Sequence, residues 1–188
     1  TVGRPVASVD IRIAPHEGCT GRAGELWVRG GIVFREYYRN PRATAEHFHF
    51  DWFKTGDLVR RERGGYLRVI GRVKNIIVTD GGKNIYPEEI ERVLGAAPEV
   101  KEVCVVGVRQ DGGGERPVAV VVPQREHLSA ACGGDRAAQD RCLKQHLLAR
   151  AAHLADYKRP KELIIRDDVP KTATLKVKRA VLREELER

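Results

Sequence analysis

Apolar and polar residues alternate along the first seventy positions. Val9-Asp-Ile-Arg-Ile13 has this pattern, and Gly24-Glu-Leu-Trp-Val-Arg-Gly30 repeats it. Successive side chains of a strand point to opposite faces, so the pattern predicts half-buried β-strands. Two more strands, at 57–63 and 66–70, flank Gly64-Gly65, a two-residue connection suited to a tight hairpin turn. Asn40-Pro41 predicts an N-cap and the start of a short helix. One small antiparallel sheet or barrel accounts for this region.

The pattern changes after Gly71-Arg-Val-Lys74, where strands and helices begin to interleave. Proline and two glutamates open a predicted helix at 87–94. Two β-branched runs, 100–108 and 117–122, flank Gly112-Gly-Gly114 and are expected to pair as a hairpin. The other expected elements are a strand at 75–78, a helix from about 135 to 155, a strand at 163–165 and a closing helix at 181–186.

The predicted fold class is therefore α+β, with a small antiparallel, barrel-like β-rich subdomain followed by a compact α+β domain. We place the first at residues 1–73, a junction at residue 74 and the second at residues 75–188. The chain contains no methionine and begins at Thr1 within a predicted strand. We therefore expect it to be part of a longer protein.

Composition and charge narrow the class of protein. The longest apolar runs, such as 118–122, are far shorter than the roughly 20 residues that span a membrane. A net charge of +8 is compatible with nucleic acid, an anionic membrane surface or phosphorylated small molecules as partners. Most basic residues are scattered among acids; the exception is a basic cluster formed by Lys158, Arg159, Lys161, Lys171, Lys176, Lys178 and Arg179.

Several catalytic and metal-binding classes do not fit. His47 and His49, and His146 and His153, lack the cysteines or carboxylates that would complete a zinc site, so no metal is predicted. No serine lies in Gly-x-Ser-x-Gly, and no glycine cluster fits a Walker loop. The four cysteines, at 19, 104, 132 and 142, are widely spaced without a Cys-x-x-Cys motif and are expected to be reduced, as in the cytoplasm.

Three local patterns carry the remaining chemistry. They are Trp52-Phe-Lys-Thr-Gly-Asp57, Gly71-Arg-Val-Lys74 and Pro170-Lys-Thr-Ala-Thr-Leu-Lys-Val-Lys-Arg179. Taken singly, each has an ordinary explanation: a turn, a charged linker and a solvated basic loop. Their order and spacing, with Gly81-Gly-Lys-Asn-Ile-Tyr-Pro-Glu-Glu-Ile-Glu91 between them, are far more specific.

With these motifs the sequence resembles the AMP-forming acyl-CoA synthetases of the adenylate-forming superfamily. The resemblance runs from Gly3-Arg-Pro5 to Lys176. Thr55-Gly-Asp57 and the segments 76–84 and 174–179 are most similar to the long-chain fatty acid–CoA ligase branch. The resemblance implies two steps. A carboxylate and ATP give an acyl-adenylate and pyrophosphate, and the thiol of CoA then displaces AMP.

The resemblance also implies roles for individual residues. Asp57 would accept hydrogen bonds from both ribose hydroxyls of the nucleotide, and Arg72 would donate to the same ribose. Lys176 would be the catalytic cation between the carboxylate and the α-phosphate. Lys74 would be the hinge of a mobile C-terminal domain. The loop of Gly81, Gly82 and Lys83 would line the CoA tunnel, where glycines permit close approach.

Two departures from the family pattern limit these expectations. Leu175 stands where the family usually has glycine, so Lys178 is a second candidate for the catalytic lysine. The phosphate loop rich in Ser, Thr and Gly and the aromatic-Gly-x-Thr-Glu segment do not occur in this sequence. ATP, with its Mg²⁺, would then be bound mainly by the protein's own N-terminal domain, and CoA would be the second substrate. The chain alone is expected to adenylate nothing.

Alternatives remain open at this point. The acid that the enzyme activates would be selected by residues outside this sequence. The acceptor could be a carrier protein or oxygen in place of CoA. A different class is a nucleic-acid-binding module that uses the basic cluster, but Tyr157 is the only aromatic residue nearby for base stacking. We expect no specific nucleic-acid partner. Partners would be ATP or AMP, acyl-adenylate and CoA. The expected location is the cytoplasm, and peripheral contact with a membrane stays open.

Overall fold

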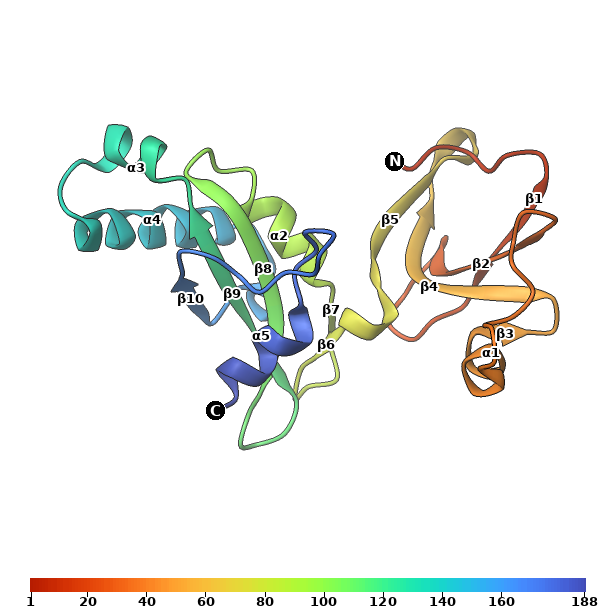
Figure 1. Cartoon of the computed structure of the whole chain (residues 1–188). Coiled ribbons are helices and arrows are strands. Elements are labelled where there is room, and N and C mark those ends of the chain that lie inside the picture. Colours follow the sequence, from red (N-terminus) through yellow and green to blue (C-terminus); the bar gives the residue numbers. More distant parts are fainter. The chain divides into compact units, whose positions relative to one another are not determined.

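The computed structural model describes all residues, 1–188, and the chain divides into two compact units, Thr1–Lys74 and Asn75–Arg188 (Figure 1). Each unit has its own sheet. The mixed α+β fold class predicted from the sequence is confirmed. No helix of the structure combines the length and the apolar character that crossing a membrane requires.

The first unit is a curled antiparallel sheet with one short helix. Its elements are β1 (Val9–Ala14), β2 (Ala23–Gly30), α1 (Pro41–His47), β3 (Phe48–His49), β4 (Trp52–Arg61) and β5 (Leu67–Arg72). The strand order is β1-β2-β4-β3, and β5 also pairs with β4. Asn40 caps α1, because its side-chain oxygen accepts a hydrogen bond from the Ala43 N–H at 3.0 Å.

The connection between β4 and β5 is longer than the predicted two-residue turn. β4 ends at Arg61 instead of residue 63, and the connection contains a 3₁₀ turn, Arg63–Gly65. Gly64 and Gly65 have φ of 73° and 81°, a region that favours glycine, and the Glu62 N–H donates to the Tyr66 carbonyl. The glycine pair therefore marks the turn correctly, but it does not form the whole connection.

The second unit is a three-stranded sheet with helices on both faces. Its elements are β6 (Ile77–Val78), β7 (Asn84–Ile85), α2 (Pro87–Leu94), β8 (Val100–Arg109), β9 (Glu115–Pro123), α3 (Arg125–Cys132), α4 (Arg136–Ala151), β10 (Glu162–Ile165) and α5 (Arg179–Leu186). The sheet order is β10-β9-β8; β8 and β9 form the predicted hairpin, and β10 runs parallel to β9. β6 and β7 pair separately.

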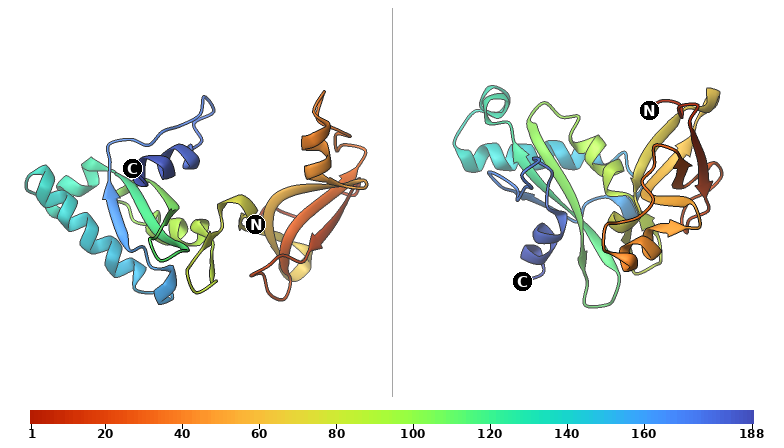
Figure 2. Two further views of the ribbon diagram at one scale, coloured as in Figure 1. Left: turned by 90° about the horizontal axis from the view of Figure 1, so that it is seen from below. Right: turned by 45° about the vertical axis from the view of Figure 1, so that its right-hand side comes forward.

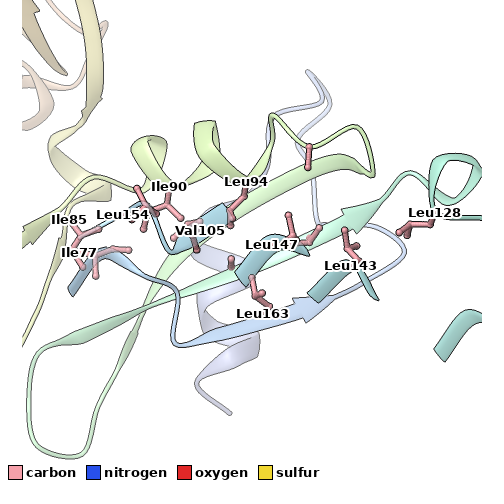
Figure 3. Packing of buried hydrophobic residues seen from close by; sticks show 14 residues of the cluster. Ile77, Ile85, Ile90, Leu94, Val105, Leu128, Leu143, Leu147, Leu154 and Leu163 are labelled. Carbon is pink, nitrogen blue, oxygen red and sulfur yellow. The ribbon is translucent and has the colours of Figure 1, made fainter. Parts of the chain in front are cut away.

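The sheet of the second unit is buried on both faces, which explains why its strands are almost continuously apolar. Alternate residues of β8 and β9 enter two different clusters. Val105, Ala119 and Val121 pack with α2 and α4, where Ile90, Leu94, Leu143 and Leu147 gather (Figure 3). The intervening residues of both strands face the other side of the sheet and pack with Leu182 of α5. They are Cys104, Val106, Val108, Val118, Val120 and Val122. α4 and α5 therefore lie on opposite sides of the sheet (Figure 2, left).

Two helix predictions are corrected. Helix α3 was not predicted, because Leu128 is its only buried residue and its hydrophobic pattern is weak. The long helix begins as predicted with Asp135 as N-cap but ends at Ala151, not at residue 155. Beyond that end, the Arg159 side chain donates to the carbonyls of Ala152 and Leu154 and so satisfies them outside a helix.

The expectation that all four cysteines are reduced is wrong for one pair. Cys132, the last residue of α3, and Cys142, in α4, form a disulfide. The reversal of direction between the two helices brings together residues that are ten positions apart. The absence of a Cys-x-x-Cys motif does not exclude this pairing, because the pairing depends on helix α3, which was not predicted. Cys19 and Cys104 are free.

Candidate active site

An irregularity in β4 positions the Thr55-Gly-Asp57 motif. Against β2, the three residues Thr55–Asp57 stand opposite Leu26 alone, since the pairing passes from Glu25↔Leu58 to Trp27↔Lys54. Gly56 has φ of 71°, which a glycine adopts without strain. A β-bulge of this kind bends the strand and redirects its side chains, and bulges are frequent beside active sites.

The other edge of β4 is interrupted at the same place. β3 pairs with Trp52 and Phe53, β5 pairs from Asp57 onward, and the residues between have no strand partner on this edge. The Thr55 hydroxyl compensates for part of the lost pairing. It donates to the Leu26 carbonyl at 2.8 Å and accepts from the Asp57 N–H at 3.1 Å. The Asp57 backbone is thereby held at the end of the gap.

Asp57 and Arg72 form an ion pair at this gap. They are register partners of β4 and β5, and Arg72 Nε lies 2.8 Å from Asp57 Oδ1. The Asp57 side chain is 28% exposed and that of Arg72 is 51% exposed, so both remain accessible from solvent. The two residues expected to share one ribose are therefore adjacent in the first unit.

Glu25 is a supporting residue that the sequence analysis treated only as part of a strand. Its carboxylate accepts from the Trp27 indole N–H at 2.9 Å and from the Gly56 N–H at 3.2 Å. The side chain thus supplies an acceptor for a backbone group that the bulge leaves without a strand partner. Its place inside Gly24-Glu-Leu-Trp-Val-Arg-Gly30, a motif shared with the family, was the available signal.

Lys176 lies in a tight loop of the second unit. The Thr172 N–H donates to the Lys176 carbonyl at 2.8 Å, and the Lys176 N–H donates to the Thr172 hydroxyl at 3.1 Å. An isolated bridge between Lys171 and Val177 closes the loop. Lys176 is exposed, while Leu175 beside it has φ of 60°. Lys178 is also exposed and is the N-cap residue of α5.

Most of the basic cluster is neutralised within the second unit. The paired residues are Lys158 with Glu89, Arg159 with Asp156, Lys171 with Glu102 and Asp168, and Arg179 with Glu91. Lys161, Lys176 and Lys178 have no ion-pair partner in the chain. The free positive charge is thus much smaller than the sequence indicates, which weakens the case for a nucleic-acid surface. It also leaves Lys176 and Lys178 available to an anionic ligand.

The loop predicted to line a CoA tunnel is a compact turn at residues 79–83. The Thr79 N–H bonds to the Lys83 carbonyl at 3.0 Å, and the Thr79 hydroxyl accepts from the Lys83 N–H at 3.1 Å. Gly81 and Gly82 are exposed, and Gly82 has φ of 69°. Gly114, at the tip of the β8–β9 hairpin, lies against Asp80 so closely that a Cβ there would collide with the Asp80 backbone. The Lys83 Nζ lies 4.7 Å from the centre of the Tyr157 ring.

Lys74 is the last residue of the first unit and the middle residue of a 3₁₀ turn, Val73–Asn75. Its side chain is exposed. The next residue, Asn75, belongs to the second unit and donates to Glu88 Oε1 of α2 at 3.0 Å. The junction residue expected from the sequence therefore lies at the end of one unit.

Two surface hollows lie away from these residues. One, of about 390 Å³, is lined by Val78 and by the tip of the β8–β9 hairpin. The other, of about 460 Å³, lies beside Cys19 and Arg61 in the first unit. Neither is lined by Asp57, Arg72 or Lys176. Lys176 is exposed, and the side chains of Asp57 and Arg72 are partly exposed, so all three are accessible from solvent.

Comparisons with known proteins agree with the motifs. Residues 89–176 match the AMP-binding enzyme C-terminal domain. A long-chain-fatty-acid–CoA ligase of Haemophilus influenzae is 38% identical over 98% of this chain and 31% of its own length. An indoleacetate–CoA ligase of Aromatoleum aromaticum is 37% identical over 98% of this chain and 34% of its own length. The crystal structure of ATP-bound MatB from Rhodopseudomonas palustris has a TM-score of 0.79 at 34% identity, over 98% of this chain and 35% of that one.

The chain belongs to the adenylate-forming enzymes that carry the AMP-binding C-terminal domain, and the resemblance stated from its motifs is confirmed. It spans about a third of the length of the curated relatives it matches. Relatives of similar identity are named for different acids, so membership in the family leaves the acid unassigned.

Proposed function

We propose that the protein carrying this chain is an AMP-forming acid–CoA ligase whose acid is a long-chain fatty acid. The main support for the proposal is the ion pair of Asp57 and Arg72 at the β4 bulge. The two residues belong to the motifs Thr55-Gly-Asp57 and Gly71-Arg-Val-Lys74, which are typical of the family. Ligases for long-chain fatty acids among the relatives support the acid, and the indoleacetate ligase supports an aryl acid as the alternative.

In the proposed nucleotide site, Asp57 accepts hydrogen bonds from the two ribose hydroxyls. A carboxylate suits this task because its two oxygens offer several lone pairs. The Arg72 Nε fixes the Asp57 carboxylate, and the two Nη groups of the same guanidinium remain able to donate to the ribose. The bulge supports this geometry, because Thr55 and Glu25 hold the backbone on either side of Gly56.

Lys176 is proposed as the cation that stabilises negative charge between the acid and the α-phosphate during adenylation. An ammonium is a compact charge with three donors, and the absence of an ion pair within the chain leaves it free for this contact. Lys74 is proposed as the hinge, since a few residues are enough to absorb a domain rotation. Gly81, Gly82 and Lys83 are proposed to line the path of the CoA thiol.

Mg²⁺ would accompany ATP, and the cluster of three possible metal ligands in this chain does not fit it. Mg²⁺ prefers an octahedral set of oxygen ligands. The one cluster of possible metal ligands in the chain consists of Cys132, Cys142 and His146. Sulfur and imidazole do not suit this ion. We propose that the Mg²⁺ of ATP is bound mainly by residues outside this chain, as the family resemblance implies.

A comparison of two neighbouring lysines tests the proposal in the full-length protein. We expect Lys176→Ala to slow acyl-adenylate formation by about 100- to 1000-fold, the loss typical of one charge-stabilising donor. Thioester formation from supplied acyl-adenylate should be largely retained. Pyrophosphate release measures the first step, and acyl-CoA measured by chromatography reports the second.

Lys178→Ala is the matched control, because Lys178 is also an exposed lysine and lies on the same segment. It should leave both steps within a few-fold of wild type. Equal loss of both steps in Lys176→Ala, or a larger loss in Lys178→Ala, would contradict the role of Lys176. Faster turnover of indoleacetate than of a long-chain fatty acid by the unmodified enzyme would exclude the proposed acid but not the reaction.

A further inference from the structure

A group of sulfur and nitrogen ligands lies where α3 meets α4, outside every residue assigned to the ligase reaction. Cys132 and Cys142 are joined there, and His146 follows Cys142 by one helical turn of α4. His146 Nε2 lies 3.9 Å from Cys142 Sγ. One ligand atom from each of the three residues lies within 4.8 Å of the others. The Cys142-x-x-x-His146 spacing was visible in the sequence, but the third ligand comes from a helix that was not predicted.

The α3–α4 hairpin holds these ligands together by contacts other than the disulfide. Arg125, the first residue of α3, pairs with Asp140 of α4 at 2.6 Å. Gln139 donates to the Ser129 hydroxyl at 3.2 Å and to the Gly134 carbonyl at 3.3 Å. Leu128 of α3 and Leu143 of α4 are both fully buried in one cluster. The hairpin would therefore keep the two sulfurs close after reduction.

A carboxylate lies beside the other ring nitrogen of the histidine. Glu99, one residue before β8, has Oε1 at 3.5 Å from His146 Nδ1, and its side chain is only 15% exposed. Metal-ligating histidines almost always donate their second ring nitrogen to a carboxylate or carbonyl, which fixes the tautomer and ring orientation. With Nδ1 facing Glu99, Nε2 faces Cys142 Sγ. The contacts between α3 and α4 and the position of Glu99 therefore support the geometry of this cluster.

The structure points to a redox-controlled metal site, and we propose that the reduced Cys132–Cys142 pair binds Zn²⁺ or a similar divalent ion with His146. Two thiolates and one imidazole are a donor set for zinc, with a fourth position left to water. The disulfide is the alternative, metal-free state. A dithiol reductant supplies two electrons and two protons to the disulfide and becomes a disulfide itself. Zn²⁺ then displaces the two thiol protons, which pass to solvent.

The buried free cysteine, Cys104, does not compete for this role. Cys104 is buried in the sheet, and burial raises the pKa of its thiol to about 11. A thiol that stays protonated at neutral pH is a poor metal ligand. Cys132 and Cys142, in contrast, are half-buried and His146 is exposed, so an ion can reach them from solvent. The site is independent of the proposed ligase reaction.

Cobalt substitution in the full-length protein tests the proposal. After reduction by a phosphine and its removal, Co²⁺ should produce thiolate-to-cobalt charge-transfer absorption and the visible bands of tetrahedral coordination. Zn²⁺ should abolish these bands by displacement. The oxidised protein should show neither, and reduction should restore them. Absence of the charge-transfer band in fully reduced protein overturns the proposal.

Variants assign the bands to this cluster. Cys142→Ser should remove most of the charge-transfer absorption, and His146→Ala should weaken Co²⁺ and Zn²⁺ affinity at least tenfold. His127→Ala is the matched control, because His127 is exposed on α3 and is not part of the cluster. Equal spectra and affinities in wild type and His146→Ala would overturn the proposal. Since His146 is exposed, its removal should not disturb folding, which circular dichroism checks.

Glu99 is proposed as a positioning residue, not a ligand. Glu99→Gln should weaken Zn²⁺ affinity about 10- to 100-fold, the usual effect of removing the partner of a metal-bound histidine. The positions of the cobalt bands should stay those of wild type, because the ligand set is unchanged. A merely structural role of Glu99 would leave the affinity of the folded protein unaltered, and that result would overturn the positioning role.

Discussion

Leu175 is held in a left-handed backbone conformation without a packing contact to explain it. Its φ is 60° and its residue surface is 79% exposed. The conformation costs a residue with a Cβ about 1–2 kcal/mol. The loop bonds between Thr172 and Lys176 impose it, since they close the turn around residue 175. The glycine usual in the family would remove this cost.

We expect Leu175→Gly to raise the free energy of unfolding by about 0.5 kcal/mol. Relief of the left-handed cost should exceed the entropy, about 0.4–1 kcal/mol, that glycine adds to the unfolded chain. Chemical denaturation of the chain measures the difference. Leu175→Ala is the control, since alanine keeps the Cβ and should gain nothing. Equal stability of the glycine and alanine variants would show that the strain is not at this residue.

At the scale of elements, α2 and α5 protect the free edge of β8. Glu91 of α2 accepts from the Val105 N–H at 2.7 Å, and Arg179 of α5 donates to the Val105 carbonyl at 2.7 Å. Arg179 also binds the Glu91 carboxylate with both Nη groups, at 2.7 and 2.9 Å. Burial by itself would lower the pKa of Arg179, but the hydrogen bonds and charge of Glu91 outweigh it and raise the pKa.

Removal of Arg179 should therefore cost more than removal of an ordinary surface arginine. We expect Arg179→Ala to lower the free energy of unfolding by about 2–3 kcal/mol, because Glu91 keeps a poorly solvated charge without its partner. Arg116→Ala is the comparison, since Arg116 forms a more exposed pair with Glu162 and should cost less than about 1 kcal/mol. Similar losses in both variants, measured by urea unfolding, would refute this view of the edge.

The same elements show what the sequence could predict. Strands β1 and β2 follow from strict alternation, and β8 and β9 follow from β-branched runs beside a glycine loop. The roles of Glu91 and Arg179 could not be inferred, because they depend on three segments far apart in the sequence meeting at Val105. Likewise, the motifs selected Asp57 and Arg72, but the bulge that places them depends on the register between β2 and β4.

At the scale of the whole chain, the two units differ greatly in buried core. In the first unit only four apolar residues are buried: Ala14, Leu58, Val59 and Leu67. Its other apolar side chains include Tyr38 and Phe50, which are 81% and 90% exposed. The second unit has two clusters, one on each face of its sheet. Since burial of apolar surface is the main favourable term in folding, the second unit should be the more stable.

Both tryptophans, Trp27 and Trp52, lie in the first unit, so the difference can be measured in the intact chain. We expect tryptophan fluorescence to change at a lower denaturant concentration than far-UV circular dichroism, which reports both units. Non-coincident transitions are the signature of departure from two-state unfolding. Trp52→Phe, which leaves Trp27 as the reporter, should keep the order of the transitions. Coincident curves would mean that the units unfold together.

The close approach of Gly114 to Asp80 has an evolutionary consequence. A side chain at position 114 would push the backbone of the 79–83 loop from outside, although the β8–β9 hairpin contributes no proposed functional group. Tolerance of substitutions at position 114 therefore depends on that loop as well as on the hairpin's own turn, where Gly114 has φ of 70°. Because two segments that are separate in the sequence must change together, a residue outside the loop proposed to line the path of the CoA thiol constrains how that loop can change.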